Sequence, residues 1–303
     1  MDVAVSLQNL VKTFGTHRAV DGVSLDIPKG IIFGLIGPNG AGKTTTIRMI
    51  LDILRPDSGE VRIMGQPAGD KANDRIGYLP EERGLYRKTK VLDMLEYLGA
   101  LRGGSPSEAR QEASGWLDRM QLADWKTHKV EDLSKGMQQK IQLIGAILRK
   151  PELLILDEPF SGLDPVNQDM FKDLMLDLNR GGATIIFSTH QMETAEKLCK
   201  EIALINRGRL VLQGPLGQVK ARFGKNSVLV EFDGDGTFLT GLPGVARVDD
   251  YGRYQEIRLT DGADPQSLLR AAVGRVTLRR FEIVEPTLHN IFLEQVGGRT
   301  ADA

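Results

Sequence analysis

The octet Gly37–Thr44 combines residue types and a spacing that suit a chain of phosphates. It runs Gly-Pro-Asn-Gly-Ala-Gly-Lys-Thr. The backbone N–H groups of such a glycine loop, at the start of a helix, face an anion, and Lys43 reaches the β- and γ-phosphates. The Thr44 hydroxyl is a ligand for Mg²⁺. The residues predicted to hold a nucleoside triphosphate are Gly37, Pro38, Asn39, Gly40, Ala41, Gly42, Lys43, Thr44 and Thr45.

Two carboxylates at the end of an apolar run complete the residue types that phosphoryl transfer needs. Asp157 and Glu158 directly follow Leu153–Leu156. Asp157 is expected to hold Mg²⁺, usually through water, because a hard cation prefers oxygen ligands. Glu158 can accept the proton of a water that attacks the γ-phosphate. Two acids could also mark an ordinary strand exit, but the loop Gly37–Thr44 favours the catalytic interpretation.

The flanking sequence predicts the elements that position these residues. The octet follows the apolar run Ile31–Ile36, which is typical of a buried strand, and leads into Thr45–Leu51, which is typical of a helix. Strand patterns return at Leu153–Leu156 and Ala183–Ser188, separated by a helix near 165–179. Strands that alternate with helices predict an α/β fold with a mostly parallel sheet. Ligands of such sheets bind at the carboxyl ends of strands, where both motifs fall.

Two further stretches extend this α/β unit. Residues 3–27 alternate apolar and polar side chains and predict antiparallel strands. A helical stretch is expected between about 90 and 150. In it, Ser105 is the predicted N-cap of a helix with Pro106 at its first position, and Glu108 completes a capping box.

Composition limits the classes of function. The chain has 303 residues, of which 41% are hydrophobic and 26% charged, and its formal net charge is −1. This balance gives no reason to expect nucleic acid or a membrane surface as a direct electrostatic partner. No apolar run approaches the roughly 20 residues of a transmembrane helix, and no secretory leader is recognisable. The single cysteine, Cys199, excludes an internal disulfide and suits a reducing cytosol.

The length of the chain and a change in its sequence pattern near residue 217 predict two domains, 1–216 and 217–303. The second is expected to be a small α+β domain in which the strands form a glycine-punctuated meander. Arg275, Arg279 and Arg280 are interpreted as a solvated face. The predicted strands are Ser227–Phe232, Val245–Val248 and Gln255–Leu259, and the predicted helices are 265–272 and 286–296.

The segment Leu133–Lys140 resembles the signature motif of the ATP-binding cassette (ABC) ATPases. Ser134 and Gly136 match the family pattern, whereas Lys135 and Met137 depart from it. The resemblance extends over roughly residues 3–216. It implies a P-loop NTPase core with a mostly parallel sheet, an antiparallel β subdomain and a helical signature subdomain.

The resemblance also assigns roles to single residues. Phe14 lies where the family places an aromatic that stacks on adenine, with a core phenylalanine as the alternative. His190 is similar to the switch histidine that senses the γ-phosphate, which makes Glu158, His190 and Lys43 the expected catalytic set. Glu81 stands where the family has the Q-loop glutamine, and its charge gives it a stronger attraction for Mg²⁺.

In the family, the loop and the signature contact different ATP molecules. The resemblance therefore implies a head-to-tail homo- or heterodimer, with each ATP between Lys43 of one protomer and Ser134 and Gly136 of the other. It further implies an ATP-hydrolysing subunit that powers a membrane transporter, with Glu158 as the base. The spanning permease is expected to be a separate chain, and this chain to be cytoplasmic and peripheral on the cytoplasmic face of the cell membrane.

Other segments resemble those of the ABC-2 type of exporter. These are Thr44–Thr46, Ala19–Ser24 and Leu288–Leu293, and the tail domain resembles that of sodium- or drug-efflux ATPases. One alternative is a soluble ABC ATPase that acts on ribosomes or DNA. Such proteins usually carry two cassettes or a long coiled coil, and neither is visible here. A regulatory module without turnover is disfavoured by Glu158 and His190.

Overall fold

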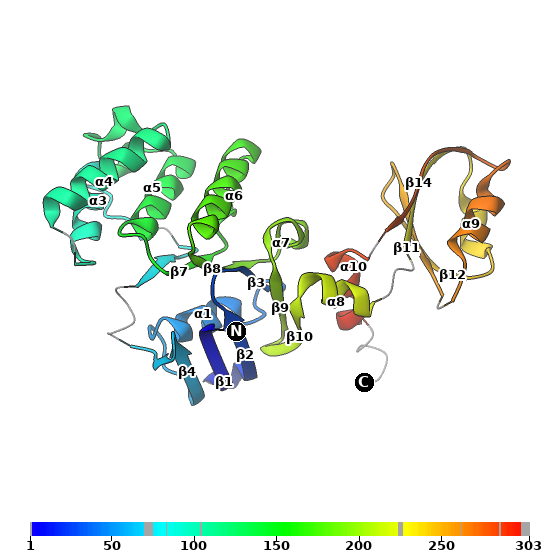
Figure 1. Cartoon of the computed structure of the whole chain (residues 1–303), viewed down its shortest axis with the longest axis horizontal. Coiled ribbons are helices and arrows are strands. Elements are labelled where there is room, and N and C mark those ends of the chain that lie inside the picture. The colour runs from blue at the N-terminus through cyan, green and yellow to red at the C-terminus, as the bar shows by residue number, and fades with distance from the viewer. Residues whose placement is uncertain are drawn as a thin grey trace. The chain divides into compact units, whose positions relative to one another are not determined.

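The computed structural model describes residues 2–69, 75–82, 84–103, 105–223, 227–260, 262–284 and 286–297. The chain forms two compact units, Met1–Gly214 and Pro215–Ala303, each with its own elements (Figure 1). This division lies two residues before the boundary expected from the sequence. Residues 298–303 of the expected second domain lie outside the described residues.

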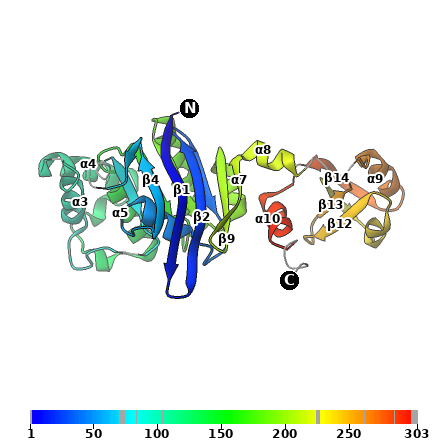
Figure 2. The ribbon, with the colours of Figure 1, turned by 90° about the horizontal axis from the view of Figure 1, so that it is seen from below.

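An antiparallel sheet opens the first unit. Its strand order is β2-β1-β4-β5, and its first two strands form a long hairpin in which Phe14 faces His17 across the turn. These strands are visible side by side in Figure 2. The antiparallel strands predicted over residues 3–27 are confirmed. The bounds are β1 Val3–Phe14, β2 His17–Pro28, β4 Ser58–Ile63 and β5 Gln66–Pro67.

The second sheet of this unit is the mostly parallel sheet that the sequence predicts. Its order is β10-β9-β3-β8-β7-β6, and neighbouring strands from β9 to β6 pair in parallel. The central strands β3, β7 and β8 are buried along their whole length, as expected for strands covered on both faces. The bounds are β3 Ile32–Ile36, β6 Ile76–Leu79, β7 Leu153–Asp157, β8 Thr184–Thr189, β9 Glu201–Asn206 and β10 Arg209–Pro215.

One hydrophobic core joins the two sheets of the first unit through α1. The side chains of Ile47, Met49 and Ile50 on this helix share a cluster with Leu7 of β1 and Phe33 of β3. Burial of such side chains is the main stabilising term, about 1.5–3 kcal/mol for each fully buried one. The helix is thereby fixed at the point where the glycine loop ends. The bounds are α1 Lys43–Ile50, α6 Pro165–Arg180 and α7 Met192–Leu198.

Three helices, α3 Val91–Ala100, α4 Pro106–Arg119 and α5 Lys135–Ile147, gather on one side of the parallel sheet (Figure 1). The capping box predicted for α4 is confirmed, because Ser105 Oγ accepts from the Glu108 N–H and the Glu108 carboxylate accepts from the Ser105 N–H. Among the described residues, no helix is both long enough and apolar enough to cross a bilayer.

The second unit consists of a four-stranded antiparallel sheet and helices, which agrees with the predicted α+β domain. A small core that includes Val228, Val230, Ile257 and Leu268 joins α9 to one face of the sheet. Its elements are α8 Leu216–Arg222, β11 Ser227–Asp233, β12 Val245–Asp250, β13 Gln255–Leu259, α9 Pro265–Ala272, β14 Thr277–Val284 and α10 Leu288–Gly297.

The strand order β12-β13-β11-β14 shows that the meander predicted for this sheet is wrong. The strand β14 was not predicted, and it pairs with β11 from Ser227↔Val284 to Asp233↔Thr277. Arg279 and Arg280 lie on this edge strand, where Arg279 pairs with Asp233 and Arg280 with Glu282. Charged side chains are common on edge strands, where they hinder pairing with further strands. Arg279 and Arg280 thus lie on a strand that the sequence pattern did not reveal.

Gly77 in β6 lies against α5 and leaves no room there for a side chain. A Cβ at this position would lie 2.2 Å from the Ala146 carbonyl oxygen and 2.9 Å from Leu154 Cδ1. We expect Gly77→Ala to destabilise the first unit by about 1–3 kcal/mol, because backbone cannot move aside as a flexible side chain can. The control is Gly115→Ala in α4, where a Cβ meets nothing within 4 Å and stability should rise by about 0.5–1 kcal/mol. Thermal unfolding of both variants checks this, and equal midpoints would contradict it.

Candidate active site

The glycine loop connects β3 to α1 and leaves no room for side chains at two of its positions. A Cβ at Gly37 would lie 2.1 Å from the Ile205 carbonyl oxygen. Gly42 has a φ of 108°, and a Cβ there would lie 2.4 Å from the Ala19 carbonyl oxygen. The loop is therefore pressed against β2 and the end of β9, so its backbone is held in one conformation.

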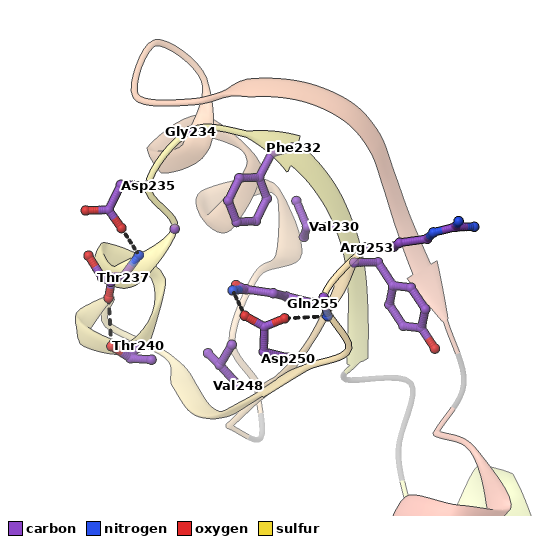
Figure 3. Close-up of a pocket in the computed structure, with 13 residues that line it drawn as sticks. Val230, Phe232, Gly234, Asp235, Thr237, Thr240, Val248, Asp250, Arg253 and Gln255 are labelled. Atoms are coloured by element: carbon purple, nitrogen blue, oxygen red, sulfur yellow. Dashed lines mark hydrogen bonds between the residues drawn. The ribbon is translucent and has the colours of Figure 1, made fainter.

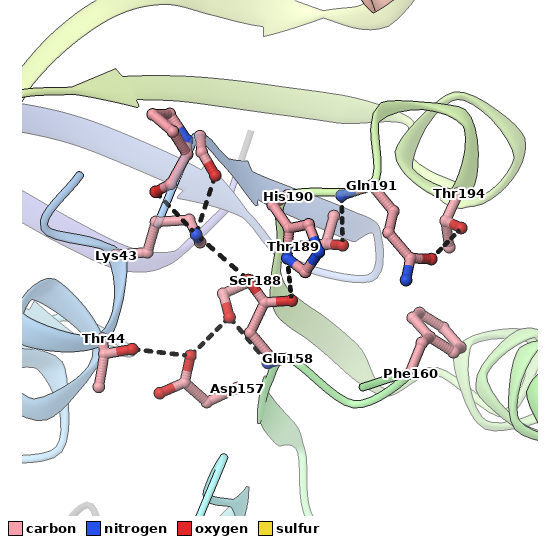
Figure 4. Close-up of polar contacts among 12 residues, drawn as sticks. Lys43, Thr44, Asp157, Glu158, Phe160, Ser188, Thr189, His190, Gln191 and Thr194 are labelled. Carbon is pink, nitrogen blue, oxygen red and sulfur yellow. Dashed lines mark hydrogen bonds and ion pairs between the residues drawn. The ribbon is translucent and has the colours of Figure 1, made fainter. Parts of the chain in front are cut away.

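Lys43, the first residue of α1, is buried with only 6% of its surface exposed. Its ammonium donates hydrogen bonds to the carbonyl oxygens of Gly37 and Pro38 at 2.9 and 3.2 Å. It also lies 3.2 Å from Glu158 Oε1 (Figure 4). A buried charge is tolerated only with such partners. The lysine thus links the loop to the carboxylate that follows β7.

Asp157 ends β7 and lies against both the loop helix and β8. Its Oδ1 accepts hydrogen bonds from Thr44 Oγ1 at 3.2 Å and from Ser188 Oγ at 2.5 Å. Its Oδ2 is buried and has no hydrogen-bond partner. Burial raises the pKa of the Asp157 carboxyl above its usual value, the two hydroxyl donors oppose this rise, and the neighbouring Glu158 adds to it.

The free Oδ2 and the Thr44 hydroxyl fit a magnesium ion. Both are hard oxygen ligands, and a cation there would give the unpartnered oxygen of a buried carboxylate a partner. Among the described residues, no group of three or more acidic, histidine or cysteine side chains forms a metal cage. This agrees with Mg²⁺ sites that use one or two protein ligands and complete the shell with water and substrate phosphates.

Glu158 is held between Lys43 and His190. Its Oε2 lies 3.0 Å from His190 Nδ1, and its backbone N–H donates to Ser188 Oγ at 2.9 Å. Glu158 also has a φ of 48°, which is uncommon for a residue other than glycine and is typical of functional sites. His190 follows β8, so the register of β7 and β8 brings both side chains to one edge of the sheet.

A cavity of about 470 Å³ lies over the loop. It is lined by Phe14, His17, Ala19, Asn39, Gly40, Ala41, Gly42, Lys43, Thr44, Thr45, Glu81 and Glu158. Phe14 is 50% exposed, so it is not the core phenylalanine that the sequence left as an alternative. The structure thus brings Phe14 and Glu81 to the same cavity as the glycine loop.

Ser134 and Gly136 lie elsewhere. Ser134 is the exposed N-cap of α5, and its Oγ accepts from the Met137 N–H at 3.3 Å. Neither residue is among the described residues that line the cavity over the loop. Within the described part of the chain, the signature segment therefore does not line the cavity over the loop.

Comparison with known proteins decides the family. Residues 20–161 match the model of the ABC transporter family, and residues 214–296 match the C-terminal domain of DrrA1-3-like ATP-binding proteins. An uncharacterized ABC transporter ATP-binding protein of Bacillus subtilis is 45% identical, over 97% of this chain and 98% of its own length. The chain belongs to the ATP-binding proteins of ABC transporters.

Two further similarities agree with this. The Nod factor export ATP-binding protein I of Rhizobium sp. is 33% identical, over 97% of each chain. A solved structure of an ATP-binding subunit of an ABC transporter is 30% identical, with a TM-score of 0.68 over 73% of this chain and 93% of that chain. The family confirms the predicted P-loop fold, nucleotide binding and ATPase activity coupled to transport, and it does not favour the soluble alternative acting on ribosomes or DNA.

Sequence reasoning missed three residues of this ABC ATPase site. The Ser188 hydroxyl donates to Asp157 and accepts from the Glu158 N–H. The sequence feature that could have indicated this residue is its position near the end of a predicted strand, two residues before His190. His17 and Ala19 line the nucleotide cavity from β2. Their place in the site follows from the hairpin register, in which His17 pairs with Phe14. Pairing between two strands cannot be recognised from either segment alone.

The raised pKa of Asp157 predicts a pH-dependent stability for this ABC ATPase. The folded state binds the proton more tightly than the unfolded state, so stability is lost as pH rises from 3.8 through the folded pKa. We expect Asp157→Asn to raise the unfolding midpoint of the nucleotide-free protein at pH 7, and this gain to shrink as pH falls toward 4. Thermal unfolding across pH measures it.

The same substitution should weaken Mg²⁺-dependent nucleotide binding, because one candidate ligand oxygen is lost. A matched control is Asp164→Asn, an exposed acid whose pKa is lowered by hydrogen bonds from Asn167. It should destabilise at pH 7 instead. If the unfolding midpoint of Asp157→Asn fell at pH 7, as is expected of the control, the predicted destabilising effect of the buried Asp157 carboxylate would be contradicted.

Proposed function

We propose that this ABC ATPase completes its catalytic sites only in a head-to-tail dimer. The observation that carries the proposal is the separation within one chain of Lys43, which lines the nucleotide cavity, from Ser134 and Gly136, which do not. Ser134 and Gly136 lie at the start of α5, where backbone N–H groups favour an anion. In the proposed dimer, each signature segment faces the γ-phosphate held by the partner's loop.

The contacts of Lys43 supply a mechanism for hydrolysis. Its ammonium is now paired with loop carbonyls and with Glu158. A γ-phosphate in the loop is a stronger partner, since it carries more charge and accepts charge-assisted hydrogen bonds. When Lys43 turns to the phosphate, Glu158 Oε1 is released and becomes available to orient and deprotonate the attacking water. His190 Nδ1 lies 3.0 Å from Glu158 Oε2, so His190 stabilises the charge that develops next to this carboxylate.

The remaining site residues act on the nucleotide and its metal. Phe14 stacks on the adenine ring, and the Gly37–Thr45 backbone binds the phosphates. Mg²⁺, when bound to Thr44 and Asp157, neutralises charge on the phosphate oxygens. Glu81 lines the same cavity from the segment after β6 and contributes a further oxygen toward the metal.

The transporter is proposed to be an exporter of the ABC-2 type. Support comes from the match of residues 214–296 to a DrrA1-3-like C-terminal domain and from the relative named for Nod factor export. The chain then binds a separate permease subunit at the cytoplasmic face of the cell membrane, with no nucleic acid partner. The domain boundary is proposed at the start of this C-terminal match, near 214–217.

Glu158→Gln tests the proposed base. The amide cannot take a proton, so we expect turnover to fall by ~10²–10⁴, which corresponds to roughly 3–5 kcal/mol of barrier. ATP still binds, and the variant should accumulate as an ATP-bound dimer visible by size-exclusion chromatography. Hydrolysis at the wild-type rate would contradict the role, as would a variant that stays monomeric with ATP.

Mixing two inactive variants tests the shared site. Lys43→Ala and Ser134→Arg should each be inactive alone, because every head-to-tail dimer then has two damaged sites. Random pairing of the two gives half heterodimers with one intact site each, so activity should return to roughly a quarter of wild type. The control is the Lys43→Ala variant mixed with the double variant Lys43→Ala, Ser134→Arg, in which no dimer has an intact site, so this mixture should stay inactive. If the single-variant mixture stays inactive while both variants still bind permease, the shared site is rejected.

A further inference from the structure

The side-chain amide of Gln139 joins the signature helix to the segment that follows Glu158. Gln139 lies in α5, which begins at the signature segment, and only 7% of its surface is exposed. Its Nε2 donates a hydrogen bond to the carbonyl oxygen of Pro159 at 2.7 Å. Pro159 is also buried and directly follows Glu158. The peptide next to the proposed base is therefore held from a helix that contributes no described residue to the lining of the nucleotide cavity.

The other half of this amide has no hydrogen bond. Gln139 Oε1 is buried and has no partner among the described residues. The reverse orientation of the amide would place its oxygen against the Pro159 carbonyl oxygen, so the donor must face Pro159. An unpaired buried oxygen costs about as much free energy as the hydrogen bond of the other half contributes. The net contribution of Gln139 to stability is therefore small, and its main consequence is to fix the Pro159 carbonyl.

The backbone at Glu158 has a conformation that its own sequence does not favour. Its φ is 48°, and the next residue is a proline, before which extended backbone is the rule. Such a conformation persists only where the surrounding structure holds it. Ser188 Oγ accepts from the Glu158 N–H at 2.9 Å, and the Ser161 N–H donates to the Glu158 carbonyl at 3.1 Å. The hydrogen bond from Gln139 holds the next carbonyl along the chain.

We propose that Gln139 is a positioning residue for ATP hydrolysis. By fixing the Pro159 carbonyl, it holds Glu158 in the conformation that places the carboxylate between Lys43 and His190. This inference rests on the proposed role of Glu158 as the base. Gln139 does not line the nucleotide cavity, so it acts on turnover through Glu158 and not on ATP binding. The segment proposed to face the partner's ATP is thereby joined to the base that serves the ATP of its own chain.

Gln139→Met tests the proposal, because it keeps the length of the side chain and removes the donor. We expect kcat to fall by about 10–100-fold, since a small misplacement of a reacting group costs this much. KM for ATP should stay within about twofold, and the unfolding midpoint within about 4 °C. The control is Asn179→Leu, which removes an amide donor to the Ala183 carbonyl, 2.8 Å away, at the end of α6. It should lower the midpoint by about 2–4 °C and leave kcat within about twofold.

A wild-type kcat in Gln139→Met would overturn the proposal. So would a midpoint lowered by more than about 10 °C, because the role of the side chain would then be structural.

A double-mutant cycle with Glu158→Gln separates this inference from the proposed base. If Gln139 acts through Glu158, Gln139→Met has no base left to misplace in the Glu158→Gln background. The double variant should then hydrolyse ATP in a single turnover within about threefold of the rate of Glu158→Gln alone. A further loss of tenfold or more in the double variant would reject the positioning role and leave the base intact. Hydrolysis by Glu158→Gln at the wild-type rate would reject the base itself, and the positioning role with it.

Discussion

The buried ammonium of Lys43 is the charge on which the rest of the site depends. Only 6% of the lysine surface is exposed, so it must have oxygen partners at every stage. These partners are two loop carbonyls and Glu158. A phosphate and Glu158 therefore compete for one cation. In the proposed mechanism, a γ-phosphate that pairs with Lys43 would release Glu158, and substrate binding would thereby be coupled to hydrolysis.

The proposed coupling depends on the sheet register, which fixes the residues around Lys43. Asp157 pairs with Ser188 across β7 and β8, and Ile36 pairs with Thr189 across β3 and β8. The ends of three parallel strands thus meet at one edge, and the Gly37 N–H donates to the Thr189 carbonyl there. Ser188 then orients both Asp157 and the Glu158 backbone. A shift of one residue in either pairing would turn these side chains to other faces.

Sequence alone predicted the features that are encoded locally. The glycine loop, the acids after Leu156 and the capping box of α4 each depend on neighbouring residues, so their patterns are legible in one segment. Features that depend on pairing between distant segments were missed or wrong. Ser188 and His17 reach the site through the register of paired strands. The strand β14 was not recognised because an edge strand with consecutive arginines lacks strict alternation of apolar and polar residues. A cavity of the second unit, lined by Phe232, Thr237 and Val248 among others, is likewise formed by three segments that share no motif (Figure 3).

The proposed dimer also bears on the signature segment, whose ligand would come from a second chain. Ser134 Oγ accepts from the Met137 N–H, and its hydroxyl hydrogen remains available as a donor. Lys135 then places a cation in the first turn of α5, where no acidic side chain offsets it. The helix dipole makes a cation unfavourable at this end by about 0.3–1 kcal/mol. A phosphate chain offered by a second cassette would relieve that cost. Lys135, which departs from the family pattern, is therefore compatible with the proposed shared ATP, because it would add attraction for an anion at the first turn of α5.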